Sequence, residues 1–336
     1  MRGMNDIAKP ALPSCVINCV VYDKAGARHD ITLDAISDVL AQDDGSFVWV
    51  GLYEPADEIL EKLQEEFCLH DLAVEDAQNA HQRPKLEAYG NSMFVVIHTA
   101  QVVNEKIVYG ETHAFVGPRY LITVRHGASL SYAAVRERVE REPELLVLGP
   151  SYGLYAVLDF IVDNYRPIID EFRETADSLE HAIFADTYSR QTVVRLYELK
   201  RELTKMRLAV GPLQDVLSQL SRTQSALVPE EVRLYFRDVY DHALRVNESI
   251  DTLREMLTTA LSVNLSLVTL GQGEVVKRLG AWAALLAAPT LITSWYGMNF
   301  HAMPELDKAY AYPALIGGVV LVCGTLYWLF KRAKWL

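Results

Sequence analysis

The sequence predicts an α+β membrane protein with an N-terminal α/β cytoplasmic domain, a charged helical segment, and a very long stalk helix continuous with the first of two C-terminal transmembrane helices. Three observations support this prediction. Two stretches near the C-terminus are long, apolar and free of charged residues; a heptad pattern precedes the first of them; and β-rich runs are confined to about the first 150 residues. Of 336 residues, 50% are hydrophobic and 23% charged, which excludes a disordered or low-complexity chain.

The charge is distributed unevenly along the chain. From Lys277 to the end, six basic residues outnumber two acidic ones by four, so residues 1–276 carry a formal charge of −16 within the total of −12. An acidic body is a poor match for nucleic acid, whose binding depends on Lys and Arg, and it suits multivalent cations better. The four cysteines form no CxxC pair and the N-terminus has no apolar core of signal-peptide length, so we expect the body to fold in the cytoplasm.

Residues 1–150 are expected to form the cytoplasmic α/β domain. Short runs rich in β-branched and aromatic residues predict strands, and the pattern of residues 57–67 predicts a helix between them. The expected strands are residues 16–22, 47–52, 93–103, 112–116 and 120–125.

No constellation of catalytic residues stands out in the sequence. It contains no phosphate-binding loop, dinucleotide-binding GxGxxG, HExxH or recognisable nucleophile arrangement, so we expect no enzyme. The scattered histidines of the first domain are interpreted as structural; they are His70, His81, His98, His113 and His126.

Residues 151–228 predict a charged helical hairpin. Within it, Asp163, Asp170 and Asp177 recur every seven residues and share one helix face. A solvated face is the usual explanation of such a row, and contact with a cation is the alternative.

Residues 229–278 predict the stalk helix. Pro229 followed by two glutamates is typical of a helix start, and the next proline is Pro289, inside the first apolar stretch. If the helix is unbroken from Pro229 to Asn299, it is on the order of 100 Å long at about 1.5 Å per residue. Apolar residues spaced alternately by four and three form a heptad seam from Val232 to Leu267. We expect this seam to pack partly within its own chain and partly against copies in other subunits.

Residues 279–300 and 309–330 predict two transmembrane helices, because each stretch holds 22 residues without a charge. A pair of buried core helices is the alternative. Basic residues precede the first span and form the tail 331–336, whereas the external loop 301–308 carries a single Lys, so both termini are expected on the cytoplasmic side of the cell membrane. Two spans cannot enclose a hydrated path, so transport would require copies to assemble around an axis.

The end of the first span carries a distinctive motif: residues 296–300 read YGMNF, residues 303–306 read MPEL, and the chain ends in KRAKWL. This combination resembles the signature of the CorA family of magnesium and cobalt channels. Residues 74–76 with 82–85, and residues 235–242, are similar to further motifs of the family's body. The resemblance covers most of the chain. It implies a homopentameric funnel in the lipid bilayer, with the first spans around one axial pore.

The resemblance implies that Gly297, Met298 and Asn299 form the entry filter for a hydrated ion. Mg²⁺ dehydrates reluctantly, so neutral oxygens that face a water-coated ion avoid the cost of stripping it. A ring of carboxylates would hold the ion too tightly to release it.

Further positions of the pore follow from the same resemblance. Thr290 falls where the family has a hydroxyl ring and Leu279 where it has an apolar constriction, and Tyr296 is expected to line the same pore. In the external loop, Glu305 and Asp307 are expected to attract cations.

Regulatory Mg²⁺ sites between subunits are also implied. Asp238 on the stalk and Asp76 with Glu75 on the α/β domain match such positions, and Asp163 of the hairpin is added to the set. Carboxylate oxygens suit this cation. Plentiful cytosolic Mg²⁺ would bridge acidic faces and hold the pore shut, and depletion would loosen the ring. The alternative is ion pairing of Asp238 and Glu75 with Arg237 or Arg83.

Three departures from the family pattern leave the gate and the ion preference open. His301 stands where many relatives carry an acidic residue, Gly273 and Ser262 replace expected Asn and Asp, and Ala287 stands near a common pore methionine. The expected cargo is Mg²⁺, with Co²⁺ and Ni²⁺ as further ions. A Zn²⁺ transporter of the same superfamily, proton-coupled or not, is the nearest rival, and a membrane-anchored scaffold without transport is a more distant one.

Overall fold

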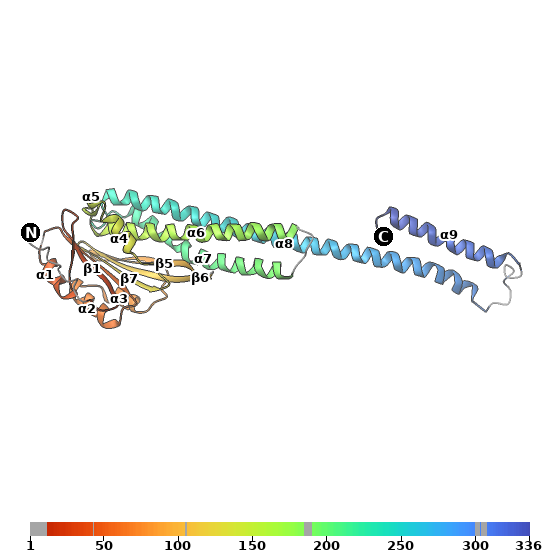
Figure 1. The fold of residues 1–336 in the computed structure, drawn as a ribbon, viewed down its shortest axis with the longest axis horizontal. Coiled ribbons are helices and arrows are strands. Elements are labelled where there is room, and N and C mark those ends of the chain that lie inside the picture. Colours follow the sequence, from red (N-terminus) through yellow and green to blue (C-terminus); the bar gives the residue numbers. More distant parts are fainter. Residues whose placement is uncertain (1–11, 43, 105, 185–189, 300–302, 304–307) are drawn as a thin grey trace, which may run out of the picture. The chain divides into compact units, whose positions relative to one another are not determined.

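The computed structural model describes residues 12–42, 44–104, 106–184, 190–299, 303 and 308–336. The chain divides into two compact units, Met1–Thr258 and Thr259–Leu336. The helix α8 (Glu230–Tyr296) contributes to both. Figure 1 shows the order of the elements along the chain.

A seven-stranded mixed sheet forms the centre of the first unit, in the order β2-β1-β3-β7-β6-β5-β4. The strands β3 and β7 pair in parallel, and every other described pair is antiparallel. All five expected strands are confirmed, and β2 and β4 are additional. The strands are β1 (Val16–Tyr22), β2 (Arg28–Asp30), β3 (Phe47–Tyr53), β4 (Lys85–Tyr89), β5 (Ser92–Val103), β6 (Lys106–Gly117) and β7 (Tyr120–Gly127).

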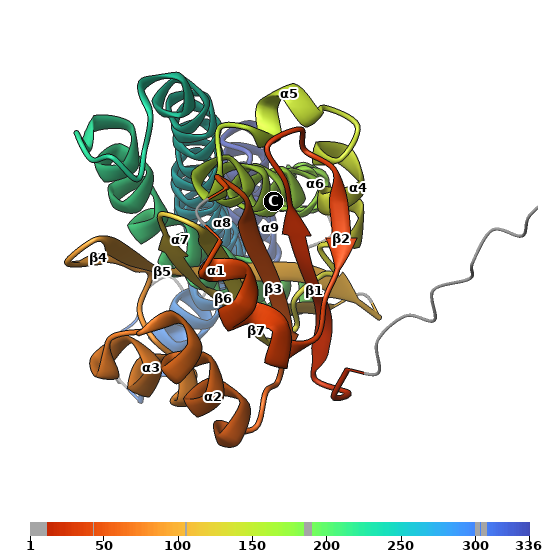
Figure 2. The ribbon, with the colours of Figure 1, turned by 90° about the vertical axis from the view of Figure 1, so that its left-hand side faces the viewer.

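Helices cover both faces of the sheet (Figure 2). The helices α2 (Asp57–Phe67) and α3 (Asp71–Gln78) bury their apolar faces in one hydrophobic core with alternate residues of the strands. The long helix α6 (Pro150–Phe184) packs on the opposite face, where Gly153 allows the close approach, because a Cβ there would lie 2.8 Å from a methyl of Leu121. The remaining short elements are a 3₁₀ turn (Leu33–Ala35), α1 (Ile36–Leu40), α4 (Ala133–Val139) and α5 (Pro143–Leu146).

The predicted hairpin is formed by α6 and α7 (Arg190–Arg222), and α8 packs beside both. Arg207 of α7 donates to Asp251 and Asn247 of α8 at 3.0 and 3.1 Å. The seam on α8 is buried from Val232 to Leu257, apart from a half-buried Val246, whereas Leu267 is exposed. Packing within the chain therefore accounts for the first part of the seam and leaves the last part open.

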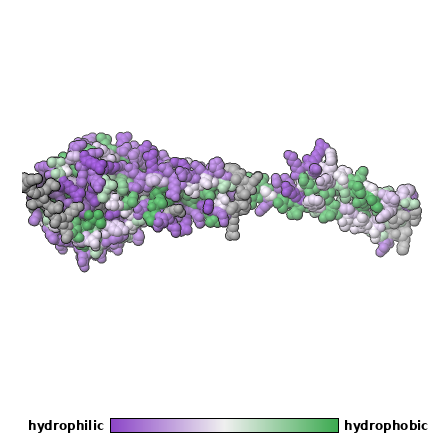
Figure 3. Space-filling model, viewed as in Figure 1, coloured by the Kyte–Doolittle hydropathy of each residue, from purple (hydrophilic) through white to green (hydrophobic). Residues whose placement is uncertain are grey.

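The second unit consists of the C-terminal part of α8 and α9 (Ala311–Arg332). By length and composition, α8 and α9 can each cross a membrane. Figure 1 shows α9 alongside the end of α8, and Figure 3 shows apolar residues on the surface of this unit. Leu286 and Leu321 are 69% and 71% exposed. Apolar area left in water costs about 25 cal/mol per Å², so this surface requires lipid or another protein chain.

Candidate metal centre and ion pathway

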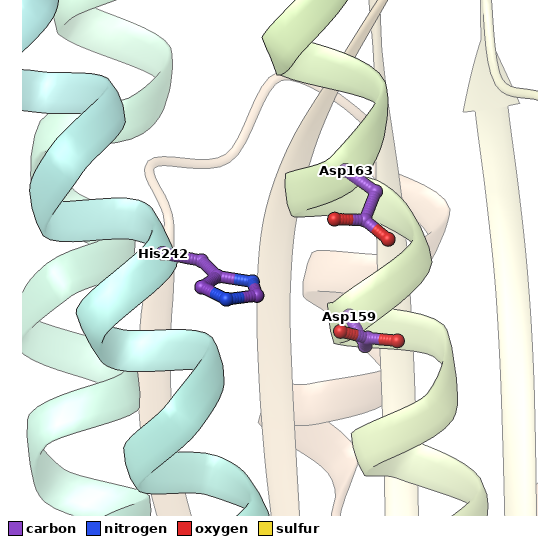
Figure 4. Close-up of side chains that lie close together, drawn as sticks. All are labelled: Asp159, Asp163 and His242. Carbon is purple, nitrogen blue, oxygen red and sulfur yellow. The ribbon is translucent and has the colours of Figure 1, made fainter.

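Two carboxylates and an imidazole converge between α6 and α8 in the first unit. The ligand atoms of Asp159, Asp163 and His242 all lie within 4.8 Å of one another (Figure 4). The two aspartates are four residues apart and therefore share one face of α6. One turn earlier, the ring of Tyr155 lies 4.9 Å from that of Tyr235, which holds α6 and α8 in the register that brings the three side chains together.

The three side chains differ in their surroundings. Asp159 is buried, and burial raises its pKa although Arg138, 2.9 Å away, favours the charged form. Asp163 is exposed and borders, with His242, a groove of about 370 Å³. Carboxylate oxygens suit Mg²⁺ and an imidazole nitrogen also suits Co²⁺, Ni²⁺ and Zn²⁺, so the cluster can hold a divalent cation that enters from solvent.

Asp238 lies beside this cluster. Its Oδ2 is 3.8 Å from Nε2 of His242, one turn further along α8. Two of the expected regulatory residues, Asp163 and Asp238, therefore flank the same imidazole.

The other two expected regulatory residues lie on α3. Asp76 forms an ion pair with Lys85 at 2.7 Å, and Glu75 is exposed. Within the described part of the chain, no ion pair joins Asp238 or Glu75 to Arg237 or Arg83, and no contact joins Asp76 to Asp238.

In the second unit, α8 ends just before the GMN tripeptide. Its last helical residue is Tyr296, and the N–H of Gly297 donates to the carbonyl of Thr293 at 3.0 Å. Met298 and Asn299 follow outside the helix. The hydroxyl of Thr290 donates to the carbonyl of Leu286 at 2.8 Å, which leaves the oxygen lone pairs of Thr290 free to accept.

The predicted pore residues do not all share one face of α8. Thr290 and Leu279 are eleven residues apart, about three turns, and lie on the same side. Tyr296 and Ile292 instead border a groove of about 720 Å³ formed with α9. Ile292 lies on roughly the opposite side of α8 from Thr290, and Tyr296 lies about 120° around the helix from Thr290.

The family follows from comparison with known proteins. Residues 44–332 match the family described as CorA-like Mg²⁺ transporter protein. The chain belongs to this family. It is 31% identical over 328 residues to the cobalt/magnesium transport protein CorA of Thermotoga maritima, covering 95% of this chain and 92% of that protein. It is 23% identical to the protein of the same name from Methanocaldococcus jannaschii, covering 96% and 100%.

The solved structure of the CorA magnesium transporter from Methanocaldococcus jannaschii has the same fold. The TM-score is 0.76 at 20% identity, and the match covers 95% of this chain and 99% of that one. The predicted resemblance and fold class are thus confirmed. As CorA-family proteins are transporters, the expectation that the chain is not an enzyme is confirmed as well.

Other predicted positions of this CorA-family chain lie on the exposed surface of α8 or outside the described residues. Glu305, Asp307 and His301 lie outside the described residues. Ser262, Gly273 and Ala287 are exposed on α8.

Three of the five histidines of the first domain make the kinds of contact expected of structural residues, whereas the side chain of His81 is exposed. His70 caps α3 by accepting from the N–H of Leu72 and stacks on Tyr89, and His98 and His126 lie within hydrogen-bond distance of backbone carbonyls. His113 is fully buried.

Sequence reasoning missed Asp159 and His242 as potential ligands. A signal for them was present, because Asp159 precedes Asp163 by one helical turn and His242 follows Asp238 by one turn.

Proposed function

We propose that this CorA-family chain transports Mg²⁺, with Co²⁺ and Ni²⁺ as further ions, across the cytoplasmic membrane as a homopentameric channel. The observation that supports this most strongly is the sequence similarity to a cobalt/magnesium transport protein, which extends over 95% of the chain at 31% identity. The names of the relatives reported above favour Mg²⁺ over Zn²⁺ as the main cargo. The positive-inside rule supports cytoplasmic N- and C-termini.

The proposed pore is lined by one stripe of α8. Residues spaced by four and three place Leu279, Ala283, Leu286, Thr290 and Thr293 on one face. This face is the one turned away from the groove with α9. Five copies of the stripe around an axis would form a path with an apolar constriction at Leu279 and a hydroxyl ring at Thr290. Tyr296, about 120° around α8 from Thr290, would support the contact with α9.

The proposed filter consists of Gly297, Met298 and Asn299 just beyond the end of α8. The helix ends in carbonyl groups that carry partial negative charge, and Asn299 adds an amide oxygen. Neutral oxygens of this kind attract a hydrated cation without replacing its water. Glu305 and Asp307 of the external loop would raise the local cation concentration.

The proposed regulation uses the acidic residues of the first unit. Asp159, Asp163, Asp238 and His242 form one half of a cation site, and Glu75 with Asp76 form the other half on a neighbouring copy. Cytosolic Mg²⁺ would bridge the two halves and stabilise the closed ring. Loss of the ion would leave like charges facing each other across the interface, and their repulsion would open the ring.

Flux into proteoliposomes tests the transport proposal. Asn299→Ala should abolish Mg²⁺ uptake, and Asn264→Ala, on the same helix but far from the filter, should retain it. Uptake of Zn²⁺ driven by a pH gradient, with little Mg²⁺ uptake, would favour the rival transporter. Absence of any flux from correctly inserted wild-type protein would contradict transport.

A second measurement tests the regulation. Asp76→Asn combined with Asp238→Asn should raise the Mg²⁺ concentration that half-inhibits the flux by roughly tenfold or more, because each lost carboxylate removes a charged ligand. Asp34→Asn, which alters the exposed ion pair of Asp34 with Lys62 away from α6 and α8, is the matched control and should leave inhibition unchanged. An unchanged response of the double variant contradicts the proposed sites.

A further inference from the structure

Three neighbouring strands of the sheet place polar side chains in one row. His98 of β5 is paired with Glu111 of β6, and Glu111 is paired with His126 of β7. Paired residues on adjacent strands point to the same face. The next row, Val96, His113 and Val124, belongs to the face that packs against α2 and α3. The three polar side chains therefore stand beneath the end of α3.

Each side chain of this row holds backbone atoms just at or after the end of α3. Nε2 of His126 lies 3.0 Å from the carbonyl oxygen of Ala77, and Nε2 of His98 lies 2.9 Å from that of Gln82. The carboxylate of Glu111 accepts from the N–H groups of His81 and Gln82, the latter at 3.1 Å. His81 has a φ of 80°, so this turn is in a conformation that needs external support.

Glu111 is buried yet charged. Burial alone raises its pKa, but the imidazole of His113, 3.3 Å away, and the hydrogen bonds from the two backbone N–H groups outweigh burial and lower the pKa to about 2. The anchor for the turn is therefore a permanent carboxylate at physiological pH.

His126 faces a hydrogen-bond acceptor at each ring nitrogen. Besides Nε2 at the carbonyl of Ala77, Nδ1 lies 3.1 Å from Oε2 of Glu54, whose other oxygen accepts from the N–H of Gly127 at 2.7 Å. A neutral imidazole carries one N–H donor and the imidazolium carries two. Only the protonated ring satisfies both acceptors.

Other titratable and charged groups surround this ring. Glu54 follows β3, Glu111 and His113 belong to β6, and the ring of His113 lies 5.2 Å from that of His126. His98 on β5, His81 in the turn and Tyr109 on β6 line the same pocket as the ring. Asp76 on α3 acts electrostatically on His113, and the guanidinium of Arg125 on β7 lies over the rings of Tyr53 and Tyr132 instead.

We propose that His98, Glu111 and His126 form an α3 clamp of positioning residues, and that the clamp is complete only when the His126 ring is protonated. Because α3 carries Glu75 and Asp76, the clamp fixes the place of these carboxylates. This consequence rests on the proposed regulation. A ring that carries only one proton leaves one of these acceptors without a donor, and the turn after α3 then loosens. Inhibition by Mg²⁺ then weakens.

Hydrogen exchange of the full-length protein in detergent tests the clamp without any transport. The measured readout is the protection of the amides in residues 79–83 from about pH 5 to about pH 8, where imidazoles change charge, corrected for intrinsic exchange rates. We expect protection in the wild type to fall roughly tenfold as pH rises. In His126→Ala it should be low throughout.

Glu54→Gln is the decisive variant. Its amide can donate to the neutral Nδ1 of His126 while its oxygen still accepts from Gly127, so protection should stay high and independent of pH. Asp23→Asn, which alters the exposed pair of Asp23 and His29, is the matched control and should behave like the wild type. A wild type without pH dependence, or a Glu54→Gln variant that retains it, overturns the clamp.

The effect on regulation is measured separately in proteoliposomes. The Mg²⁺ concentration that half-inhibits flux should rise with internal pH in the wild type and stay constant in Glu54→Gln. If hydrogen exchange follows the expected pattern but inhibition does not, the clamp stands and the regulatory role of α3 is wrong.

Discussion

The two units of this CorA-family chain differ in how far they bury their apolar side chains. In Met1–Thr258, the sheet, α6, α7 and the first part of α8 bury their large apolar residues, including Trp49, Tyr165 and Phe236. In the described part of Thr259–Leu336, the buried residues are two alanines, Ala260 and Ala281. The first unit therefore contains its own core, whereas the apolar surface of the second requires lipid or another protein chain to cover it. The helix α8 passes from one regime to the other without a break.

The strongest test of this difference is the truncation of a large side chain in the core of the first unit. Phe236 on α8 is fully buried, so Phe236→Ala should lower the free energy of unfolding by about 3–5 kcal/mol. Leu234→Ala, two residues away and 66% exposed, is the matched control and should change it by less than about 0.5 kcal/mol. Urea unfolding of the full chain in detergent measures both.

The second unit provides the counterpart. Leu286→Ala should have a small effect in the same experiment, because its side chain leaves no cavity within the chain. A loss as large as that of Phe236→Ala would break the comparison, since it would mean that the second unit has a packed core of its own.

Acid should destabilise the first unit through Glu111. Its folded-state pKa is about 2, against an ordinary value of 4.5. The carboxylate therefore contributes stability that is fully present above about pH 4.5 and is lost as pH falls toward 2. A shift of this size corresponds to roughly 3 kcal/mol.

Unfolding measured at several pH values between about 2 and 6 checks this prediction. Glu111→Gln should be less stable at neutral pH and should lose less stability on acidification. If the wild type and the variant respond to acid in parallel, other carboxylates dominate. The second unit, which has no carboxylate between Lys277 and Asn299, should contribute little to this acid response.

The parts of the fold that the sequence predicts well are those with a strong local period. The strands 16–22 and 120–125 are mostly apolar runs, and residues 57–67 have a clear amphipathic pattern; all three are confirmed. The missed strand β2 has three exposed residues, and β4 is half-buried, so neither has a pattern that distinguishes it from a loop. Their pairing depends on a neighbouring strand rather than on their own residues.

The candidate metal centre shows a different limit. Asp163 could be singled out from a seven-residue repeat, but Asp159 and His242 become partners only through the packing of α6 on α8. That register is set by contacts such as Tyr155 with Tyr235, which are about 80 residues apart in the sequence. Similarly, the heptad pattern continues past Leu257. It therefore does not predict at which residue the seam stops packing against helices of the same chain.

The smallest expected changes in stability are those of Gly→Ala variants, which compare how tightly the two units are packed. In the first unit, Gly153→Ala places a Cβ 2.8 Å from Leu121 and should cost about 1–3 kcal/mol. Apart from the adjacent backbone of α8, no described atom lies within 4 Å of a Cβ built on Gly273, so Gly273→Ala should gain up to about 1 kcal/mol from helix propensity alone. Thermal unfolding followed by circular dichroism measures both. A loss of stability in Gly273→Ala would instead place this glycine at a close contact between copies, because only a neighbouring chain could then meet the added methyl group.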